Sequence, residues 1–444
     1  MTTGLFDHPL LGGVFGDAEI AALFSVEAEL RAMVAVEIAL AQVQGAQGII
    51  PADAARAIAD RLAGFTPDPA ELTDSARANG IIVPGLVTSL RAEVGAPHGP
   101  YVHWGATTQD IMDTGLILRL RDALGMMAAR LDTLIALLAE GARQHAALPM
   151  AARTRSQVAT PTTFGLRLAG WLAPLMRCRD RLAELSPRLF VVQCGGAAGT
   201  LGVFGERGVA VMEGLAAELD LAAPAKPWHS ERDTIVELAH WLALVTGVLG
   251  KMAGDVILMG RSESRELRAG QGGGSSTMPH KANPVAAEAI VTIARHNAGQ
   301  VGAVHQAMLH AEERDGAAWA LEWMVLPQMV VSTGAALAHG VTLAGDLQPD
   351  AARMAAMLGD DTMAEAAAFA LAAHMPLGEA QALVKRAMLE DGPLQERLAV
   401  LTDGLSSQAD LGDPASTLVA AVELVARVLT GADDFRILSD DDLE

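Results

Sequence analysis

Residues 238–259 read LAHWLALVTGVLGKMAGDVILM and contain no proline. Their large apolar side chains recur at alternating intervals of four and three residues. This spacing places them on one stripe of an α-helix, and it is typical of helices that pack lengthwise against one another. The stripe consists of Leu238, Leu242, Val245, Leu249, Met252, Val256 and Met259.

A second stripe with the same spacing predicts another long helix earlier in the chain. Helical periodicity also covers residues 161–186, 285–310 and 317–345, whereas the alternation typical of strands is scarce. We therefore predict an all-α fold built around one elongated bundle of five long helices. The second stripe consists of Leu120, Leu124, Met127, Leu131, Leu134 and Leu138.

The two ends of the chain differ from the middle. One helix is expected near residues 17–46, and helices of 10–15 residues are expected after residue 346. The last twelve residues, 433–444, carry six acidic groups and are expected to form a solvated tail. The predicted division is an N-terminal helical domain (1–110), a central bundle (111–345) and a C-terminal helical domain (346–444).

The composition of the 444 residues excludes several classes of protein. Lys and Arg number 32 against 53 Asp and Glu, and a net charge of −21 disfavours nucleic acids and anionic membranes as partners. The cysteines, Cys178 and Cys194, form no CxxC pair, which disfavours disulfides and a zinc cluster. No signal peptide is recognised, and the longest uncharged apolar run, 323–338, is shorter than the roughly 20 residues that span a bilayer. We expect a cytoplasmic protein.

A glycine-rich segment, GQGGGSSTMPHKANP, runs from Gly270 to Pro284 between two of the expected helices. Its glycines alone would fit a flexible loop. Asn283 is suited to cap the next helix, with Pro284 as its first residue. Lys281 beside a helix N-terminus is repelled by the helix dipole unless an anion binds there. The segment therefore indicates an anion-binding site.

Three blocks of sequence resemble the fumarase/aspartase superfamily. Residues 275–284, SSTMPHKANP, resemble its signature GSSxMPxKxNP. Residues 101–114, YVHWGATTQDIMDT, and 153–165, RTRSQVATPTTFG, resemble its first and second blocks. The resemblance implies a homotetramer with active sites shared between subunits. It also implies an enzyme that acts on a small anionic polycarboxylate without a metal or another cofactor.

The resemblance also implies roles for individual residues. Ser275 would transfer a proton, while Lys281 and Asn283 would stabilise the negative charge that develops on the substrate. For His103 the alternative is that it only pins the loop before Thr107, and for Arg314 that it lies on a solvated helix face. The predicted substrate-binding residues are His103, Thr107, Thr108, Arg155, Gln157, Ser276, Met278 and Arg314.

Three further segments resemble one branch of the superfamily, the bacterial 3-carboxy-cis,cis-muconate cycloisomerases of protocatechuate breakdown in the β-ketoadipate pathway. They are residues 195–200, GGAAGT, 227–233, PWHSERD, and 319–323, WALEW. This branch implies lactonisation, in which a substrate carboxylate adds to an alkene carbon of the same molecule. Arg155 departs from the tryptophan usual in the branch. It either meets an extra substrate anion or pairs with an acidic neighbour.

Other functions stay open from the sequence. A 3-sulfomuconate would offer Arg155 a sulfonate in place of a carboxylate. A fumarate-releasing lyase such as adenylosuccinate lyase is another candidate, but its paired histidines have no counterpart, since Asn79 and Arg155 stand near those positions. A catalytically inactive structural homologue is disfavoured because Ser275, Lys281 and Asn283 are all present.

Overall fold

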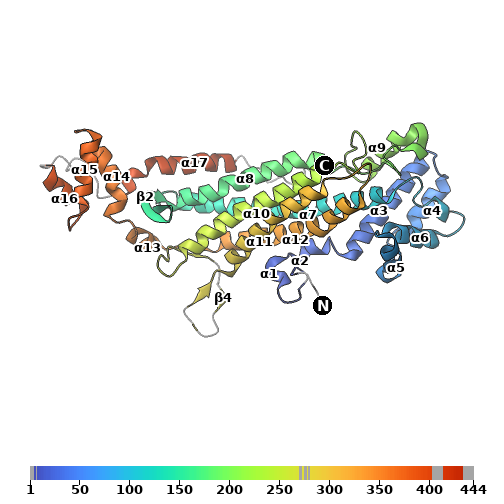
Figure 1. The fold of residues 1–444 in the computed structure, drawn as a ribbon, viewed down its shortest axis with the longest axis horizontal. Coiled ribbons are helices and arrows are strands. Elements are labelled where there is room, and N and C mark those ends of the chain that lie inside the picture. Colours follow the sequence, from blue (N-terminus) through green and yellow to red (C-terminus); the bar gives the residue numbers. More distant parts are fainter. Residues whose placement is uncertain are drawn as a thin grey trace. The chain divides into compact units, whose positions relative to one another are not determined.

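The computed structural model describes residues 5–6, 8–269, 273–274, 278, 281–402 and 414–433. Helices dominate these residues, and the strands among them form three short antiparallel pairs (Figure 1). The predicted all-α class is therefore confirmed.

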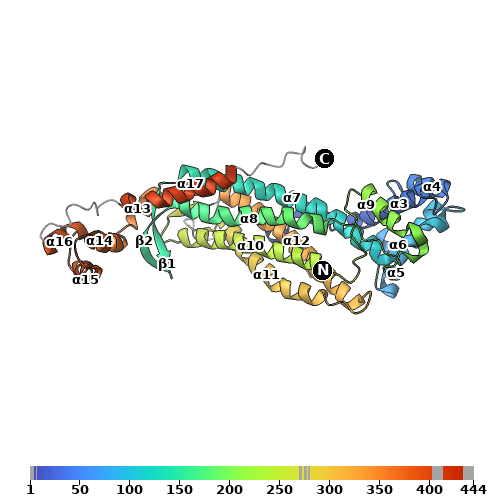
Figure 2. The same cartoon turned by 90° about the horizontal axis from the view of Figure 1, so that it is seen from above.

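Five long helices are the longest elements of the described chain. Both apolar stripes, at 120–138 and 238–259, are buried, with no member more than 5% exposed. Figures 1 and 2 both show α8 beside α10, and the Trp241 indole N–H donates to the Cys178 carbonyl oxygen between them at 2.8 Å. The helices are α7 (Thr108–Gln144), α8 (Phe164–Leu189), α10 (Asp233–Met259), α11 (Val285–Ala307) and α12 (Gly316–Gly345).

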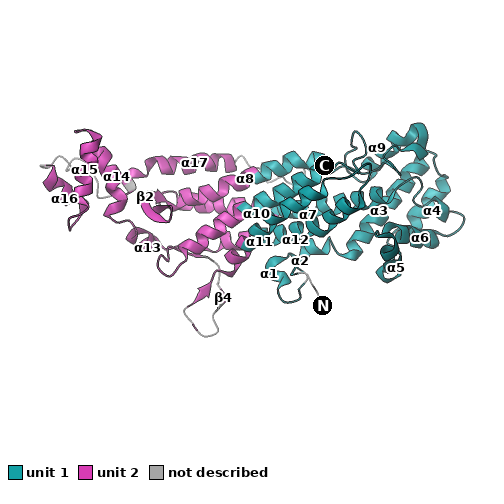
Figure 3. Cartoon of the chain, viewed as in Figure 1, with its two compact units in different colours: residues 1–129, 178–247, 292–338 teal, residues 130–177, 248–291, 339–444 magenta. Residues whose placement is uncertain are grey.

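The chain divides into two compact units, each made of separate stretches of sequence (Figure 3). The boundaries between these stretches fall inside all five long helices, so each helix contributes residues to both units. Unit 1 contains residues 1–129, 178–247 and 292–338, and unit 2 contains 130–177, 248–291 and 339–444. The division into three domains along the sequence stays a prediction.

The helix expected near 17–46 is two helices in the structure. Asp17 accepts a hydrogen bond from the Ile20 N–H at the start of α2, and Ser25 accepts one from the Ala28 N–H at the start of α3. Helix α2 ends at Ala22 and the Ser25 cap begins a new helix, a break that residue periodicity alone does not reveal. The other helices of unit 1 are α1 (Gly12–Phe15), α2 (Ala18–Ala22), α3 (Val26–Ala46), α4 (Ala52–Leu62), α5 (Pro69–Asn79), α6 (Val83–Val94), α9 (Gly208–Glu218), η1 (Gly99–Tyr101) and η2 (Gly202–Arg207).

Unit 2 contains a hairpin that the periodicity did not predict. Strands β1 (Pro149–Thr154) and β2 (Gln157–Thr163) pair antiparallel, so α8 begins at Phe164 and not near residue 161. The two residues between the strands, Arg155 and Ser156, have φ angles of 49° and 67°. Two consecutive positive φ angles characterise a type I′ turn, which asparagine and glycine usually occupy. Without them the sequence lacks the usual hairpin signal.

The remaining elements of unit 2 are short. Three of the helices after residue 346 have six or eight residues, fewer than the 10–15 expected. The acidic tail from residue 434 onward lies outside the described residues. The elements are β3 (Leu267–Ala269) paired with β6 (Leu347–Pro349), β4 (Gly273–Gly274) paired with β5 (Ala282–Asn283), α13 (Ala351–Ala356), η3 (Asp360–Met363), α14 (Ala364–Leu371), α15 (Leu377–Ala387), α16 (Leu394–Leu401), η5 (Pro414–Thr417) and α17 (Val419–Asp433).

Two helices, α10 and α12, are long and apolar enough by composition to cross a membrane. In the folded chain 44% of the apolar window in α10 and 67% of that in α12 are already buried. Core helices of a bundle have this same composition.

Candidate active site

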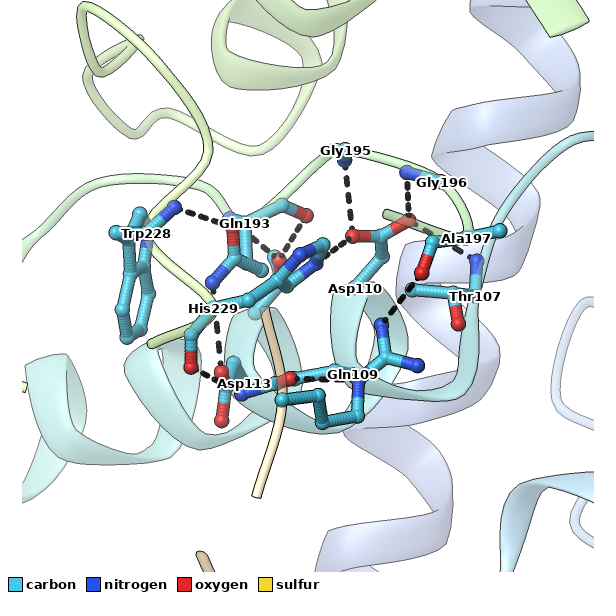
Figure 4. A network of polar contacts seen from close by, with 12 residues as sticks. Thr107, Gln109, Asp110, Asp113, Gln193, Gly195, Gly196, Ala197, Trp228 and His229 are labelled. Atoms are coloured by element: carbon cyan, nitrogen blue, oxygen red, sulfur yellow. Dashed lines mark hydrogen bonds and ion pairs between the residues drawn. The ribbon is translucent and has the colours of Figure 1, made fainter. Parts of the chain in front are cut away.

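The first block contains a buried carboxylate, Asp110, that joins three segments of unit 1. Asp110, in the first turn of α7, accepts hydrogen bonds from the backbone N–H groups of Thr107, Gly195 and Gly196 at 2.9–3.0 Å. His229 Nε2 lies 2.8 Å from Asp110 Oδ1 (Figure 4). Four donors therefore surround one carboxylate. They hold the loop before α7, which includes Thr107, against the loop that contains Gly195 and Gly196.

Gly195 is required by close packing beside this carboxylate. A Cβ atom at this position would lie 2.7 Å from Cε1 of His229 and 2.8 Å from Cβ of Pro227. Any larger residue would therefore push His229 away from Asp110. Residues 195–200 and 227–233 both resemble one branch of the superfamily. In the structure both segments contact Asp110.

Arg314 is brought to the first block by the same network. Its Nε donates to Gln109 Oε1 at 3.0 Å, and its Nη2 donates to the Ala197 carbonyl oxygen at 3.3 Å. The amide of Gln109 in turn donates to the His229 carbonyl oxygen at 2.8 Å. Arg314 is half-buried, so the alternative of a fully solvated helix face is wrong for it.

Asp315, the neighbour of Arg314, is a helix cap. Its Oδ1 accepts hydrogen bonds from the N–H groups of Ala317 and Ala318 at 2.8 and 3.1 Å, at the start of α12. These backbone hydrogen bonds lower the pKa of the Asp315 carboxyl. Asp315 therefore has a structural role as a helix cap, whereas the Arg314 side chain contacts the first block.

A buried ion-pair cluster lies one helical turn further along α7. Arg232 donates to Asp113 at 2.7 and 3.2 Å and to Glu322 at 2.6 and 2.9 Å, and its guanidinium lies 4.8 Å from the Trp228 ring centre. Burial alone would lower the pKa of Arg232, but Asp113 and Glu322 outweigh it and raise that pKa. Burial raises the pKa of Glu322, and Arg232 opposes this change. The cluster crosslinks α7, α10 and α12 near the candidate site.

His103 contacts a carboxylate on a different helix. Its Nδ1 lies 2.6 Å from Glu37 Oε1 of α3. Burial lowers the pKa of His103, but the charge of Glu37 and its hydrogen bond outweigh burial, so the pKa is raised. The alternative in which His103 pins the loop is therefore supported, and its Nδ1 is already engaged.

In unit 2, Arg155 and Gln157 lie at the exposed tip of the β1–β2 hairpin. None of the ion pairs among the described residues involves Arg155. The neighbouring Arg153 instead pairs with the fully buried Glu266 at 2.8 Å. The acidic pairing considered for Arg155 is thus made by Arg153 in the described residues, and the role of Arg155 stays a prediction.

The signature loop also lies in unit 2 and is only partly described. Met278 and Lys281 are exposed, and the Lys281 N–H donates to the Met278 carbonyl oxygen at 3.0 Å. Ser275 and Ser276 lie outside the described residues. Asn283 is not the N-cap of α11, because it pairs with Gly273 in the β4–β5 ladder. The Pro284 carbonyl oxygen accepts the first helical hydrogen bond from Glu288, so Pro284 is the cap and Val285 the first helical residue.

The predicted site residues fall into two sets. His103, Thr107, Thr108 and Arg314 belong to unit 1. The described members in unit 2 are Arg155, Gln157, Met278, Lys281 and Asn283. Within the described ranges no group of three or more His, Cys, Asp or Glu side chains is placed to hold a metal ion. Independence from metals and other cofactors stays a prediction.

Sequence reasoning assigned no role to Asp110, Asp113 or Glu37. Asp110 and Asp113 stand inside the first block, three residues apart, which places them on one face of α7. That spacing was a usable signal for a buried polar face. Glu37 gave no signal, because an isolated glutamate in an amphipathic helix is most often solvated.

Comparison with known proteins identifies the class. A family model described as lyase matches residues 19–299, and the chain belongs to this family. The resemblance to the fumarase/aspartase superfamily is thereby confirmed.

Individual relatives cover nearly the whole chain. A 3-carboxy-cis,cis-muconate cycloisomerase from Pseudomonas aeruginosa is 39% identical over 440 residues, which is 95% of this chain and 96% of the relative. The 3-carboxy-cis,cis-muconate lactonizing enzyme from Pseudomonas putida superimposes with a TM-score of 0.89 at 35% identity, covering 96% of this chain and 100% of that one. A fumarate lyase from Mesorhizobium sp. BNC1 also gives 0.89, at 37% identity, covering 95% and 100%.

Proposed function

We propose that this protein is a cycloisomerase that converts 3-carboxy-cis,cis-muconate to carboxymuconolactone. The observation that carries the proposal is the similarity, over nearly the full length of both chains, to proteins with this activity in two Pseudomonas species. The complete signature of Ser275, Lys281 and Asn283 supports an active enzyme and not an inactive homologue.

The chemistry needs charge stabilisation more than any other kind of catalysis. One carboxylate oxygen of the substrate bonds to an alkene carbon, while a proton is added to the carbon next to another carboxylate. The intermediate is an aci-carboxylate with two negative oxygens, which fixed donors and cations stabilise. Lys281 is an exposed cation three residues before the N-cap of α11, and the helix N-terminus adds a positive field. Ser275 supplies the proton in this proposal.

The substrate carboxylates require several further donors. Thr107 and Thr108, at the start of α7, and Gln157, at the hairpin, are neutral donors. Arg314 adds a cation whose Nε and Nη2 already hold Gln109 and Ala197, which leaves further N–H groups to donate. Ser276 and Met278 follow the reacting serine in the loop and complete the proposed binding surface.

Arg155 is the residue proposed to bind the third anionic substituent of the muconate. It is exposed and takes part in none of the ion pairs among the described residues, so its guanidinium can bind an anion in two parallel hydrogen bonds. A sulfonate would be bound in the same way. A 3-sulfomuconate is therefore the second candidate substrate.

Assembly into a homotetramer is part of the proposal. Large apolar side chains stay exposed on the long helices, including Leu244 at 47%, Leu258 at 52% and Met324 at 69%. Burying such side chains between subunits is favourable by about 25 cal/mol per Å² of apolar surface. A location in the cytoplasm is also proposed, because the apolar windows of α10 and α12 are partly buried within the fold.

A panel of substrates tests the proposed reaction. The purified protein is assayed with 3-carboxy-cis,cis-muconate, 3-sulfomuconate and adenylosuccinate, and kcat/KM is measured for each. We expect the carboxymuconate to give the highest value and an isomeric lactone as the only product. A higher kcat/KM for the sulfonate would reassign the substrate, and release of fumarate from adenylosuccinate would reassign the reaction.

A further inference from the structure

Two buried polar side chains on α3 reach the same turn in the first block. Glu37 and Gln44 are 1% and 0% exposed and lie seven residues apart, which places them on one face of the helix. Glu37 contacts the ring of His103, and the Gln44 amide donates to the Trp104 carbonyl oxygen at 2.7 Å. The turn they hold lies directly before Thr107.

This turn has a backbone that needs external support. His103 has a φ angle of 62° and Gly105 one of 74°, both in the left-handed region. A residue with a side chain is disfavoured there, and the cost is of order 1 kcal/mol or more unless the surroundings enforce the conformation. The contact from Gln44 to the Trp104 backbone enforces it directly.

Holding the turn does not by itself require a charged residue such as Glu37. An amide is enough to hold the turn, as Gln44 shows, whereas burying a carboxylate carries a large desolvation cost unless it is paired. Glu37 Oε1 lies 2.6 Å from His103 Nδ1, while its buried Oε2 has no hydrogen-bond partner among the described residues. Half of this carboxylate is thus unsatisfied, and the ring of His103 is what compensates its charge.

The contact at Nδ1 determines what His103 can offer to a ligand. Since Nδ1 is engaged by Glu37, Nε2 is the remaining ring nitrogen, and the side chain is 16% exposed. The charged groups that affect the ring are Glu37 on α3, Asp110 on α7 and Arg91 on α6. Burial and Arg91 lower the pKa of His103, and the two carboxylates raise it, with a net increase.

We propose that Glu37 is a positioning residue that keeps His103 protonated, so that the Nε2–H of His103 donates to a carboxylate of the substrate. This inference rests on the proposed function, since it assumes an anionic substrate beside the first block. Glu37 would thereby keep His103 cationic beside the substrate in a protein whose net charge is −21. His103 is then a substrate-binding residue that stays protonated because Glu37 on α3 contacts its ring.

The variant Glu37→Gln tests the proposal because it keeps the size and a hydrogen-bond acceptor but removes the charge. Activity that needs protonated His103 is present below its pKa and is lost as the pH rises through it. Without the charge of Glu37, only Asp110 opposes the effects of burial and Arg91, so the pKa of His103 should fall and the alkaline limb of the kcat/KM profile should move to lower pH. At the original pH optimum KM should rise about tenfold or more, with a smaller change in kcat.

Two further variants separate this role from structural support. Gln44→Leu removes the anchor of the turn but leaves the Glu37–His103 pair, so it should lower the melting temperature without moving the alkaline limb. In a His103→Asn background, Glu37→Gln should have little further effect on KM, because the group it acts on is missing. An equal shift of the limb in Gln44→Leu, or additive effects of the two substitutions, would overturn the proposal.

An NMR titration of the His103 ring in the substrate-free protein tests the proposal without relying on enzymatic activity. The ring should titrate at a higher pH in the wild type than in Glu37→Gln. This measurement separates failure of the inference from failure of the proposed function, because it involves no muconate. An unchanged titration in Glu37→Gln would refute the role of Glu37, whatever the substrate is.

Discussion

Ser275 is the residue on which the proposed chemistry depends most. A positioned acid–base group typically contributes about a hundredfold or more to turnover. Ser275→Ala should therefore lower kcat by at least about a hundredfold, while circular dichroism and the oligomeric state stay unchanged. Thr277→Ala, two residues along in the same loop, is the control for a general disturbance of the loop. Retention of more than a third of wild-type turnover by Ser275→Ala would remove the serine from the mechanism.

Arg155 offers a test of substrate specificity at the scale of one side chain. Arg155→Gln should weaken transition-state binding of 3-carboxy-cis,cis-muconate by about 1.5–3 kcal/mol, the range for losing a charge-assisted hydrogen bond. Unsubstituted cis,cis-muconate lacks the third anion and should be affected much less. The measurement is kcat/KM for both compounds on both proteins. Equal losses for the two compounds would mean that Arg155 supports the hairpin and does not read the extra anion.

At the residue scale, the sequence singled out candidate ligand-binding groups whose roles stay predictions. Lys281 was singled out because a cation beside a helix N-terminus indicates an anion site, whereas Thr107 and Arg314 were singled out by the resemblance to the superfamily. Glu37 was not recognisable, since its partner His103 is 66 residues away in sequence. Only the folded chain shows that the two side chains meet.

At the scale of secondary-structure elements, buried polar contacts link the helices of unit 1. Helix α7 carries Asp110 and Asp113 on one face, and each carboxylate binds residues from segments that are distant in sequence. The starts of α7, α10 and α12 are thus linked by buried polar contacts in addition to apolar packing. The segment 227–233 forms these connections through His229 and Arg232.

Replacement of Arg232 tests this crosslink. Arg232→Met leaves Asp113 and Glu322 buried without their cation, so the free energy of unfolding should fall by about 3–5 kcal/mol. Urea denaturation followed by circular dichroism measures the change. The matched control is Arg188→Met, which removes the solvent-exposed pair with Glu237 and should have a far smaller effect. Similar losses for the two variants would contradict a special role for the buried cluster.

The long helices were predictable, but the hairpin in the second block was not. A stripe of apolar residues with a 3.5-residue period extends over many turns, so one irregular residue does not obscure it. The hairpin is short, contains Pro161 in β2 and turns at Arg155 and Ser156 without glycine or asparagine. Its strand and turn signals were therefore both weak.

At the scale of the whole molecule, the proposed tetramer follows from apolar surface that the single chain leaves exposed. Light scattering should give the mass of four chains at working concentrations. Mixing two inactive variants, Thr107→Val and Ser275→Ala, should restore part of the activity if the sites combine residues of different subunits. A fully active monomer would refute both the assembly and the shared sites.

The reaction itself can be followed by proton NMR in D₂O, using enzyme dialysed against EDTA and 3-carboxy-cis,cis-muconate as the substrate. The proposed mechanism predicts one isomeric lactone, with a single deuterium on the carbon next to a carboxylate and no added metal required. Two fragments in place of one isomer, or activity that returns only when a divalent metal is added, would contradict a metal-free cycloisomerase.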